Sequence, residues 1–138
     1  MTGAAMSGLT APPRSFLAFD FGTKRVGVAS GNTITRTAMP LRTVAAEGDA
    51  RFTALGALIT EWQPDALVVG VPFHPDGAPH DNTARAQRFA RQLHGRFRLP
   101  VHEVDERYTT TEAHAAGAAD VDAASAAIIL EQFLRDLT

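Results

Sequence analysis

The sequence predicts a single α/β domain built on a mixed β-sheet that is flanked by helices. The chain has 138 residues, which is the length of one domain of ordinary size. Apolar residues make up 45% of it and charged residues 20%, a composition typical of globular proteins. Three strand-like segments come first, and helix-like and strand-like segments then alternate to the end. This order favours antiparallel strands followed by parallel ones.

The first three elements are predicted to be strands that meander. Residues 16–21 and 26–29 are apolar runs, and residues 22–25 between them have the composition of a turn, so the two runs predict a hairpin. The β-branched side chains within residues 33–41 predict a third strand. Pro40 is expected to disturb its pairing, because proline has no backbone N–H to donate.

Helices and strands are predicted to alternate in the rest of the chain. Apolar residues at helical spacing predict an amphipathic helix over residues 50–63. Residues 66–71 are apolar throughout, which is typical of a central strand covered on both faces. A second helix is expected over residues 82–97, capped by Asn82, and the next strand over residues 101–105. The Ala-rich remainder predicts a short helix and then a longer one over residues 122–137.

This order of elements is that of an RNase H-like fold, in which a three-stranded antiparallel meander is joined to two parallel strands. No repeat or linker divides the sequence, so we expect one domain over residues 15–138, preceded by a flexible tail over residues 1–14. The tail has no features of a signal peptide, and no apolar run approaches the roughly 18–20 residues that span a bilayer. We therefore expect no membrane insertion and a cytoplasmic location.

The charge and the residue types present exclude several kinds of site. The chain has no cysteine, which removes disulfides, thiolate metal sites and a cysteine nucleophile. Its five histidines form no close helical pair, so a zinc site is not expected. The formal net charge of −2 gives no global indication of nucleic-acid binding. The last quarter of the chain is acidic, whereas the part before it is basic.

Asp20 is the residue in the first strand that needs an explanation, because an ionised carboxylate in an apolar strand is costly unless it is paired, hydrogen-bonded or bound to a metal. Two explanations stay open on this evidence. Asp20 could accept hydrogen bonds from its own turn, or it could belong to a functional site. Lys24 and Arg25 in that turn could likewise bind a phosphate or form an ordinary solvated pair.

A second group of carboxylates lies at the end of the last predicted strand. Asp105 and Glu106 come where open α/β sheets bind their ligands, at the carboxyl end of a parallel strand. Asp122 begins the final helix, where its simplest role is an N-cap. Together with Asp20, these carboxylates supply the oxygen ligands that Mg²⁺ or Mn²⁺ prefers, and such sites are suited to phosphoryl transfer.

Four motifs in order resemble the YqgF family of RNase H-like, Holliday-junction-resolvase-like proteins. They are FLAFDFGTKRVGVASG, ALVVGVPFHPDGAPHDNTARAQRFA, VDERYTTTEA and VDAASAAIILEQFL, and the similarity runs from about Phe16 to Leu137. The resemblance implies a metal-dependent nuclease that processes the 5′ end of the 16S rRNA precursor in ribosome biogenesis. Its implied partners are nucleic acid, with precursor rRNA first and branched DNA second, and ribosomal precursor particles, with the chain a monomer or weak homodimer.

The resemblance also implies roles for particular residues. The catalytic residues, which are also the ligands of Mg²⁺ or Mn²⁺, are Asp20, Glu106 and Asp122. Asp105 and Asp120 are the reserve candidates. The expected substrate-binding residues are Lys24, Arg25, Arg107, Thr109 and Thr110. Thr109 and Thr110 are also candidate helix caps.

Two features concern substrate binding. Residues 113–120 form a shorter connection than is usual in the family and lack the basic residues that the family often has there. The predicted second helix and its exit carry a basic side, which is either a solvated face or a track for a phosphate backbone: Arg85, Arg88, Arg91, Arg96 and Arg98.

Three alternatives remain open. The chain could be a nucleic-acid-binding factor that hydrolyses poorly, or a Holliday-junction resolvase that acts on DNA. It could also be an ATPase of the actin-like or sugar-kinase-like type, because DFGTKRVG also resembles the phosphate loop of those enzymes. Its length speaks against the ATPase, since those enzymes close two such domains over the nucleotide.

Overall fold

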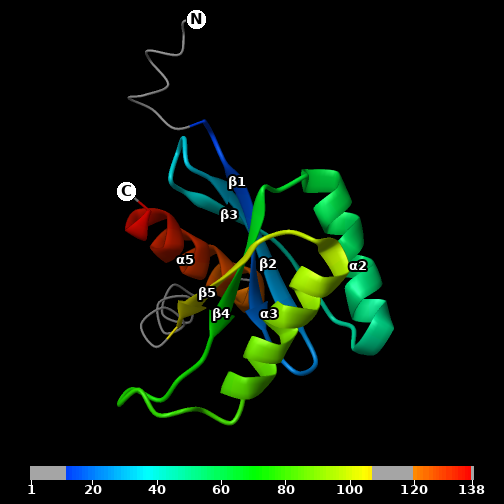
Figure 1. The fold of residues 1–138 in the computed structure, drawn as a ribbon, viewed down its shortest axis with the longest axis vertical. Coiled ribbons are helices and arrows are strands. Elements are labelled where there is room, and N and C mark those ends of the chain that lie inside the picture. Colours follow the sequence, from blue (N-terminus) through cyan, green and yellow to red (C-terminus); the bar gives the residue numbers. More distant parts are fainter. Residues whose placement is uncertain (1–11, 107–119, 138) are drawn as a thin grey trace, which may run out of the picture.

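The computed structural model describes residues 12–106 and 120–137, which form a five-stranded sheet with helices on both faces (Figure 1). Within these residues the elements follow one another in the order β1 (Ser15–Phe21), β2 (Val26–Asn32), β3 (Ala38–Val44), α2 (Gly48–Trp62), β4 (Ala66–Val71), α3 (Thr83–Phe97), β5 (Val101–Asp105) and α5 (Val121–Asp136). The short helix predicted after Thr110 falls outside the described residues.

The strands lie in the order β3-β2-β1-β4-β5. β1 pairs with β2, and β2 with β3, in antiparallel register, whereas β4 runs parallel to both β1 and β5. β1 is therefore the central strand that joins the antiparallel and the parallel halves. The predicted arrangement of a meander plus two parallel strands is confirmed, and all six residues of β4 are buried, as an apolar strand covered on both faces requires.

The third strand is placed later in the chain than the sequence predicts. It spans Ala38–Val44, whereas the β-branched run predicts residues 33–41. The reason is a turn held by Asn32, whose side-chain oxygen accepts hydrogen bonds from the backbone N–H groups of Ile34 and Thr35, each at 3.0 Å. Pro40 is tolerated because β3 is an edge strand, and the ladder to β2 shifts its register beside it.

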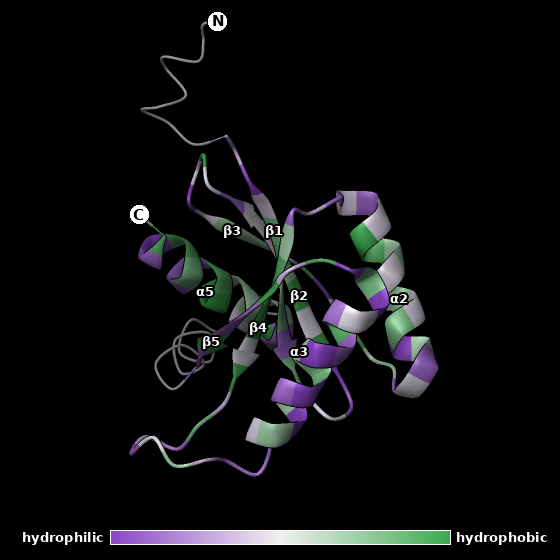
Figure 2. Cartoon of the chain, viewed as in Figure 1, coloured by the Kyte–Doolittle hydropathy of each residue, from purple (hydrophilic) through white to green (hydrophobic). Residues whose placement is uncertain are grey.

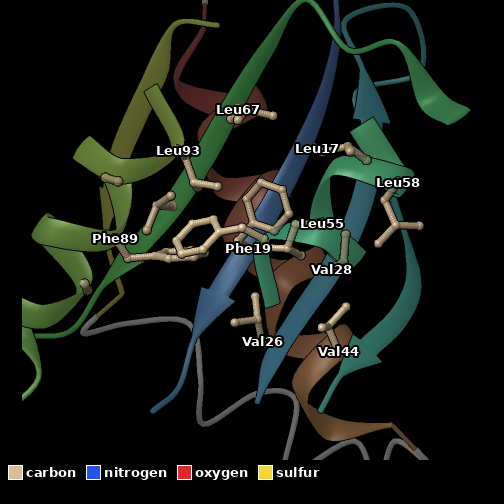
Figure 3. Packing of buried hydrophobic residues seen from close by; sticks show 14 of the residues in the cluster. Leu17, Phe19, Val26, Val28, Val44, Leu55, Leu58, Leu67, Phe89 and Leu93 are labelled. Carbon is tan, nitrogen blue, oxygen red and sulfur yellow. The ribbon is translucent and has the colours of Figure 1, made fainter. Parts of the chain in front are cut away.

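The two faces of the sheet are covered by different helices. α2 and α3 pack on one face, where the buried core includes Leu17, Phe19 and Phe89, while α5 packs on the other face against Phe16 and Ala18 (Figures 1 and 3). Because side chains alternate along a strand, the residues of β1 divide between these two layers. Hydrophilic residues lie along the surface of α3, and hydrophobic ones gather in the strands beneath it (Figure 2).

The helix ends show which polar residues act as caps. Asn82 occupies the N-cap position of α3, as predicted, but makes no side-chain capping bond; its oxygen accepts from Arg85 Nη1 at 3.1 Å instead. At α5 the cap is Asp120, which accepts from the backbone N–H of Ala123 at 3.1 Å, so the expectation that Asp122 caps this helix is wrong. Asp122 lies two residues further on, in the first turn of the helix.

Candidate functional site

Asp20 lies near the end of the central strand and belongs to the face of the sheet that α5 covers. Phe16 and Ala18 precede it on the same face, and both are buried against α5. Its direct neighbours across the sheet are two glycines, Gly27 on β2 and Gly70 on β4. The half-buried Asp20 carboxylate is therefore flanked on both sides by positions that have no side chain.

Glu106 is the first residue after β5, and its backbone N–H donates to the carbonyl of Val71 on β4 at 3.1 Å. Its side chain follows His102 and Val104 by alternation, so it points to the α5 face, as Asp20 does. Only 9% of Glu106 is exposed. Burial raises its pKa to about 8, and the charge of Asp20, a side-chain hydrogen bond with Asp20 and the charge of Asp105 act in the same direction.

The glycine at position 70 makes room for the Glu106 carboxylate. A Cβ atom at Gly70 would lie 2.9 Å from Glu106 Oε2 and would also collide with the end of Ile129 on α5. Gly27 has the corresponding function on the other side of Asp20, because a Cβ there would collide with the backbone of Asp122. The two glycines thus let the Glu106 side chain and the first turn of α5 approach the sheet on either side of Asp20.

The third predicted carboxylate, Asp122, stands in the first turn of α5 and is partly exposed. Its Oδ2 atom forms an ion pair with Arg25 Nε at 3.1 Å. In the described part of the chain no three metal-binding side chains form a group. The structure therefore brings Asp20 and Glu106 together, and it places Asp122 beside Gly27 with its carboxylate on Arg25.

The turn between β1 and β2 supplies the basic side of the site. Lys24 and Arg25 line a cavity of about 600 Å³ together with Thr23, Asn82 and Asp122. Both cations are exposed at the same end of the sheet as Asp20, because they follow the strand that carries it. The remaining predicted substrate-binding residues, Arg107, Thr109 and Thr110, lie outside the described residues.

The donor groups of this site fit a hard divalent cation. Mg²⁺ binds oxygen atoms and commonly uses only one or two protein carboxylates, with water and phosphate as the other ligands. The Asp20–Glu106 pair offers such oxygens in a place where burial and the charges of Asp20 and Asp105 disfavour a negative charge on Glu106, as its raised pKa indicates. A bound cation would offset the negative charge of the Glu106 carboxylate, which a proton neutralises when no cation is bound.

The reserve candidates have other places in the structure. Asp120 accepts hydrogen bonds from Ala123 and from the Thr43 hydroxyl at 2.5 Å, so it ties α5 to the edge strand as a cap. Asp105 ends β5 on the opposite face from Glu106. Sequence reasoning missed Gly70. The signal was present, since a lone glycine inside the apolar run ALVVGV marks a close approach of another group to the strand.

Comparison with known proteins gives consistent results. A family model described as "RuvX: Holliday junction resolvase" matches residues 14–136. A protein of Polaromonas sp. (strain JS666 / ATCC BAA-500) named "Putative pre-16S rRNA nuclease" is 68% identical over 137 residues, covering 99% of each chain. A relative with the same name from Burkholderia pseudomallei (strain 668) is 55% identical over 139 residues, covering 96% of this chain and 95% of its own.

Among solved structures, the fold is similar to that of Thermus thermophilus RuvC in complex with a Holliday junction substrate. The TM-score is 0.55 at 14% sequence identity, over 88% of this chain and 94% of the other. At that identity the likeness concerns the fold alone. No helix in residues 12–106 and 120–137 is both long and apolar enough to cross a membrane.

Proposed function

Because the chain belongs to the RuvX (YqgF) family, we propose that it is a nuclease that hydrolyses phosphodiester bonds and processes the 5′ end of the 16S rRNA precursor. The observation that carries this proposal is the pairing of half-buried Asp20 with buried Glu106 at the carboxyl end of the parallel strands, where open α/β sheets bind ligands. The shared name of the relatives supports precursor rRNA as the substrate.

We propose Mg²⁺ or Mn²⁺ as the cofactor, held by Asp20 and Glu106 with Asp122 as the third ligand. When bound, the cation supplies positive charge that acidifies water and offsets the charge developing on the phosphate. Glu106 is buried and shares a hydrogen bond with Asp20, so deprotonation of the pair accompanies binding of the cation. The carboxylate oxygens of this site suit Mg²⁺ and Mn²⁺ better than they suit softer metals.

Arg25 is proposed to link substrate binding to the release of Asp122. Its Nε atom pairs with Asp122 in the structure, and the pair is exposed enough to be separated at small cost. A phosphate of the substrate that enters the cavity lined by Lys24 and Arg25 competes for the guanidinium. Asp122 is then free to turn toward Asp20. In this scheme the chain itself binds and orients the phosphate with its basic turn.

The place of action is proposed to be the cytoplasm, where the chain meets precursor rRNA in ribosomal precursor particles as a monomer or weak homodimer. A four-way DNA junction is the second candidate substrate. It is favoured by the description of the family model. Carboxylates and a cation act on RNA and DNA alike unless a side chain reads the 2′-hydroxyl, so the substrates must be compared directly.

The test is to incubate the purified chain with precursor 16S rRNA and with a four-way DNA junction, side by side, in Mg²⁺, Mn²⁺ or chelator. We expect cleavage of the precursor near its 5′ end in either metal, no product in chelator, and a loss of at least about a hundredfold in the Asp20→Asn variant. Preferential cleavage of the junction would replace rRNA by DNA as the substrate.

Binding of RNA in chelator without any metal-dependent product would instead support the non-catalytic alternative. An Asp20→Asn protein that cleaves as fast as the unaltered chain would refute the assignment of the site. The matched control is Asp65→Asn, which removes an exposed carboxylate from the opposite end of the β1–β4 pair. That control keeps the charge change and leaves the site intact.

A further inference from the structure

A second cavity lies on the other face of the sheet, between α2 and α3, and has a volume of about 310 Å³. It is at the same end of β1 as the carboxylates, because Phe21 lines it and directly follows Asp20. Its lining combines three arginines with aromatic and polar side chains, among them Arg51, Arg85, Arg88, Phe21, Thr23 and Gln92. No function described above uses this cavity.

Arg51 is the unusual member of this group. Only 6% of it is exposed, although a guanidinium is normally solvated or paired with a carboxylate. Its Nε atom donates to the carbonyl of Ala46 at 2.8 Å and its Nη2 atom to the carbonyl of Thr23 at 3.0 Å. Within the described residues no carboxylate forms an ion pair with Arg51. The guanidinium also lies 5.5 Å from the centre of the Phe21 ring, and burial lowers its pKa although the charge of Glu47 acts in the opposite direction. The cavity thus contains a positive charge that is buried against carbonyl oxygens and a ring.

Two contacts join this cavity to the one beside the carboxylates. Thr23 lines both of them. Arg85 lines the second cavity and donates to the side chain of Asn82, which lines the first, at 3.1 Å. The turn between β1 and β2 therefore stands between two basic cavities, one at the end of the sheet between Asp122 and Asn82 and the other between α2 and α3.

We propose that the second cavity binds a backbone phosphate of a single-stranded RNA segment that flanks the cleaved bond. This rests on the proposed nuclease function and identifies the form of its substrate. The segment leaves the carboxylates, crosses the turn at Thr23 and places a phosphate between Arg51, Arg85 and Arg88. Arginine is suited to this role because its planar guanidinium donates two parallel hydrogen bonds to phosphate oxygens.

The path favours a single strand over a duplex. It runs from the cavity at the end of the sheet to the one between α2 and α3, around a turn of a few residues between Phe21 and Val26. A duplex is stiff, with a persistence length of about 150 base pairs for DNA, and cannot bend over so short a distance. A single strand follows a positively charged groove readily, because its backbone bends at each nucleotide.

The structure also separates the arginines of α3 into two groups. All four are exposed, but Arg85 and Arg88 line the cavity, whereas Arg91 on the helix and Arg98 at its C-cap do not. The basic side of this helix is therefore not one continuous track. Replacing either pair by glutamine removes the same charge from the same region, so the second pair is a matched control for the first.

The experiment measures binding of a fluorescein-labelled RNA of about 12 nucleotides by fluorescence anisotropy, with the full chain, in chelator and at several salt concentrations. The R85Q/R88Q protein should bind the single strand about tenfold or more weakly than the unaltered chain. The slope of log K against log salt should fall by about 0.7, since the cavity holds one phosphate and each neutralised phosphate of a single strand accounts for about 0.7. The R91Q/R98Q protein should keep its affinity within about twofold.

The unaltered chain should bind the duplex, made by annealing the same RNA to its complement, more weakly than it binds the single strand. The R85Q/R88Q protein should bind the two forms about equally. Equal losses in both double variants, or equal binding of duplex and single strand, would overturn the proposal. Thermal unfolding verifies that each variant is folded. This binding experiment is independent of cleavage. RNA binding as stated, without any cleavage of precursor rRNA, would refute only the nuclease function. Cleavage of precursor rRNA together with unchanged RNA binding by R85Q/R88Q would refute only this inference.

Discussion

Replacing Glu106 by glutamine tests whether the two carboxylates share one proton in the absence of metal. Glutamine has nearly the same shape as protonated glutamate, and its amide can donate a hydrogen bond to Asp20 in the same way. The variant therefore resembles the protonated form of the site at every pH. The unaltered chain resembles it only when Glu106 holds its proton.

The size of the effect follows from the pKa of Glu106, which burial raises from 4.5 to about 8. The folded chain binds this proton more tightly than the unfolded chain does. The stabilisation is therefore complete below about pH 4.5 and is lost as the pH rises through about 8. Each pH unit inside this window changes the folding equilibrium by about tenfold, so the loss between pH 5 and pH 8 is on the order of 3 to 4 kcal/mol.

The assay is urea unfolding in chelator between pH 5 and pH 8, followed by circular dichroism. We expect the unaltered chain and Glu106→Gln to have similar free energies of unfolding at pH 5, and the variant to be more stable at pH 8 by roughly 2 to 4 kcal/mol. The comparison cancels other titrating groups, such as His102, whose pKa is lowered by burial and by the nearby charge of Arg14. Glu103→Gln, at an exposed position of the same strand, is the matched control.

A difference between the two proteins that stays constant from pH 5 to pH 8 would refute this account of the site. Addition of Mg²⁺ at pH 8 extends the test, because a ligand that binds only the folded state raises its stability. We expect Mg²⁺ to raise the free energy of unfolding of the unaltered chain and to leave that of Glu106→Gln nearly unchanged.

Three further predictions concern the surroundings of the pair. Gly70→Ala should lower the free energy of unfolding by about 1 to 3 kcal/mol and weaken metal binding, because the added Cβ displaces Glu106. Gly95→Ala, in open space on α3, should leave the free energy of unfolding unchanged or raise it in the same urea assay. Asp120→Asn should keep its cap and the metal dependence of cleavage; loss of that dependence would make Asp120 a ligand. Arg25→Gln should change stability by less than about 1 kcal/mol but raise the KM for nucleic acid about tenfold, and an unchanged KM would contradict phosphate binding there.

Much of the fold could be predicted because local sequence patterns and tertiary structure agree. The apolar run of β4 and the helical spacing within α2 correspond directly to elements of the structure. The error in β3 has a local cause. The β-branched residues after Asn32 have strand propensity, but the side chain of Asn32 holds the first of them in a turn. Propensity alone does not include this hydrogen bond.

The candidate site could be predicted only in part, since its properties depend on contacts between distant segments. Asp20 was identified because a charge in an apolar strand is unusual. The burial of Glu106 depends on β4, through Gly70 and the carbonyl of Val71, and no feature near residue 106 indicates it. In the same way, composition does not distinguish Asp120 from Asp122 as the cap of α5, whereas the structure shows Asp120 bonded to the backbone of Ala123 and to Thr43 of the edge strand.

The most direct test of the central claim is equilibrium binding of Mn²⁺, measured from the electron paramagnetic resonance signal of the free ion. The claim is that Asp20 and Glu106 together hold the divalent cation. The unaltered chain should bind Mn²⁺ more tightly as the pH rises toward about 8 and should release it to excess Mg²⁺, while Asp20→Asn and Glu106→Gln should each bind at least about tenfold more weakly. Equal Mn²⁺ affinity in all three proteins would contradict the claim.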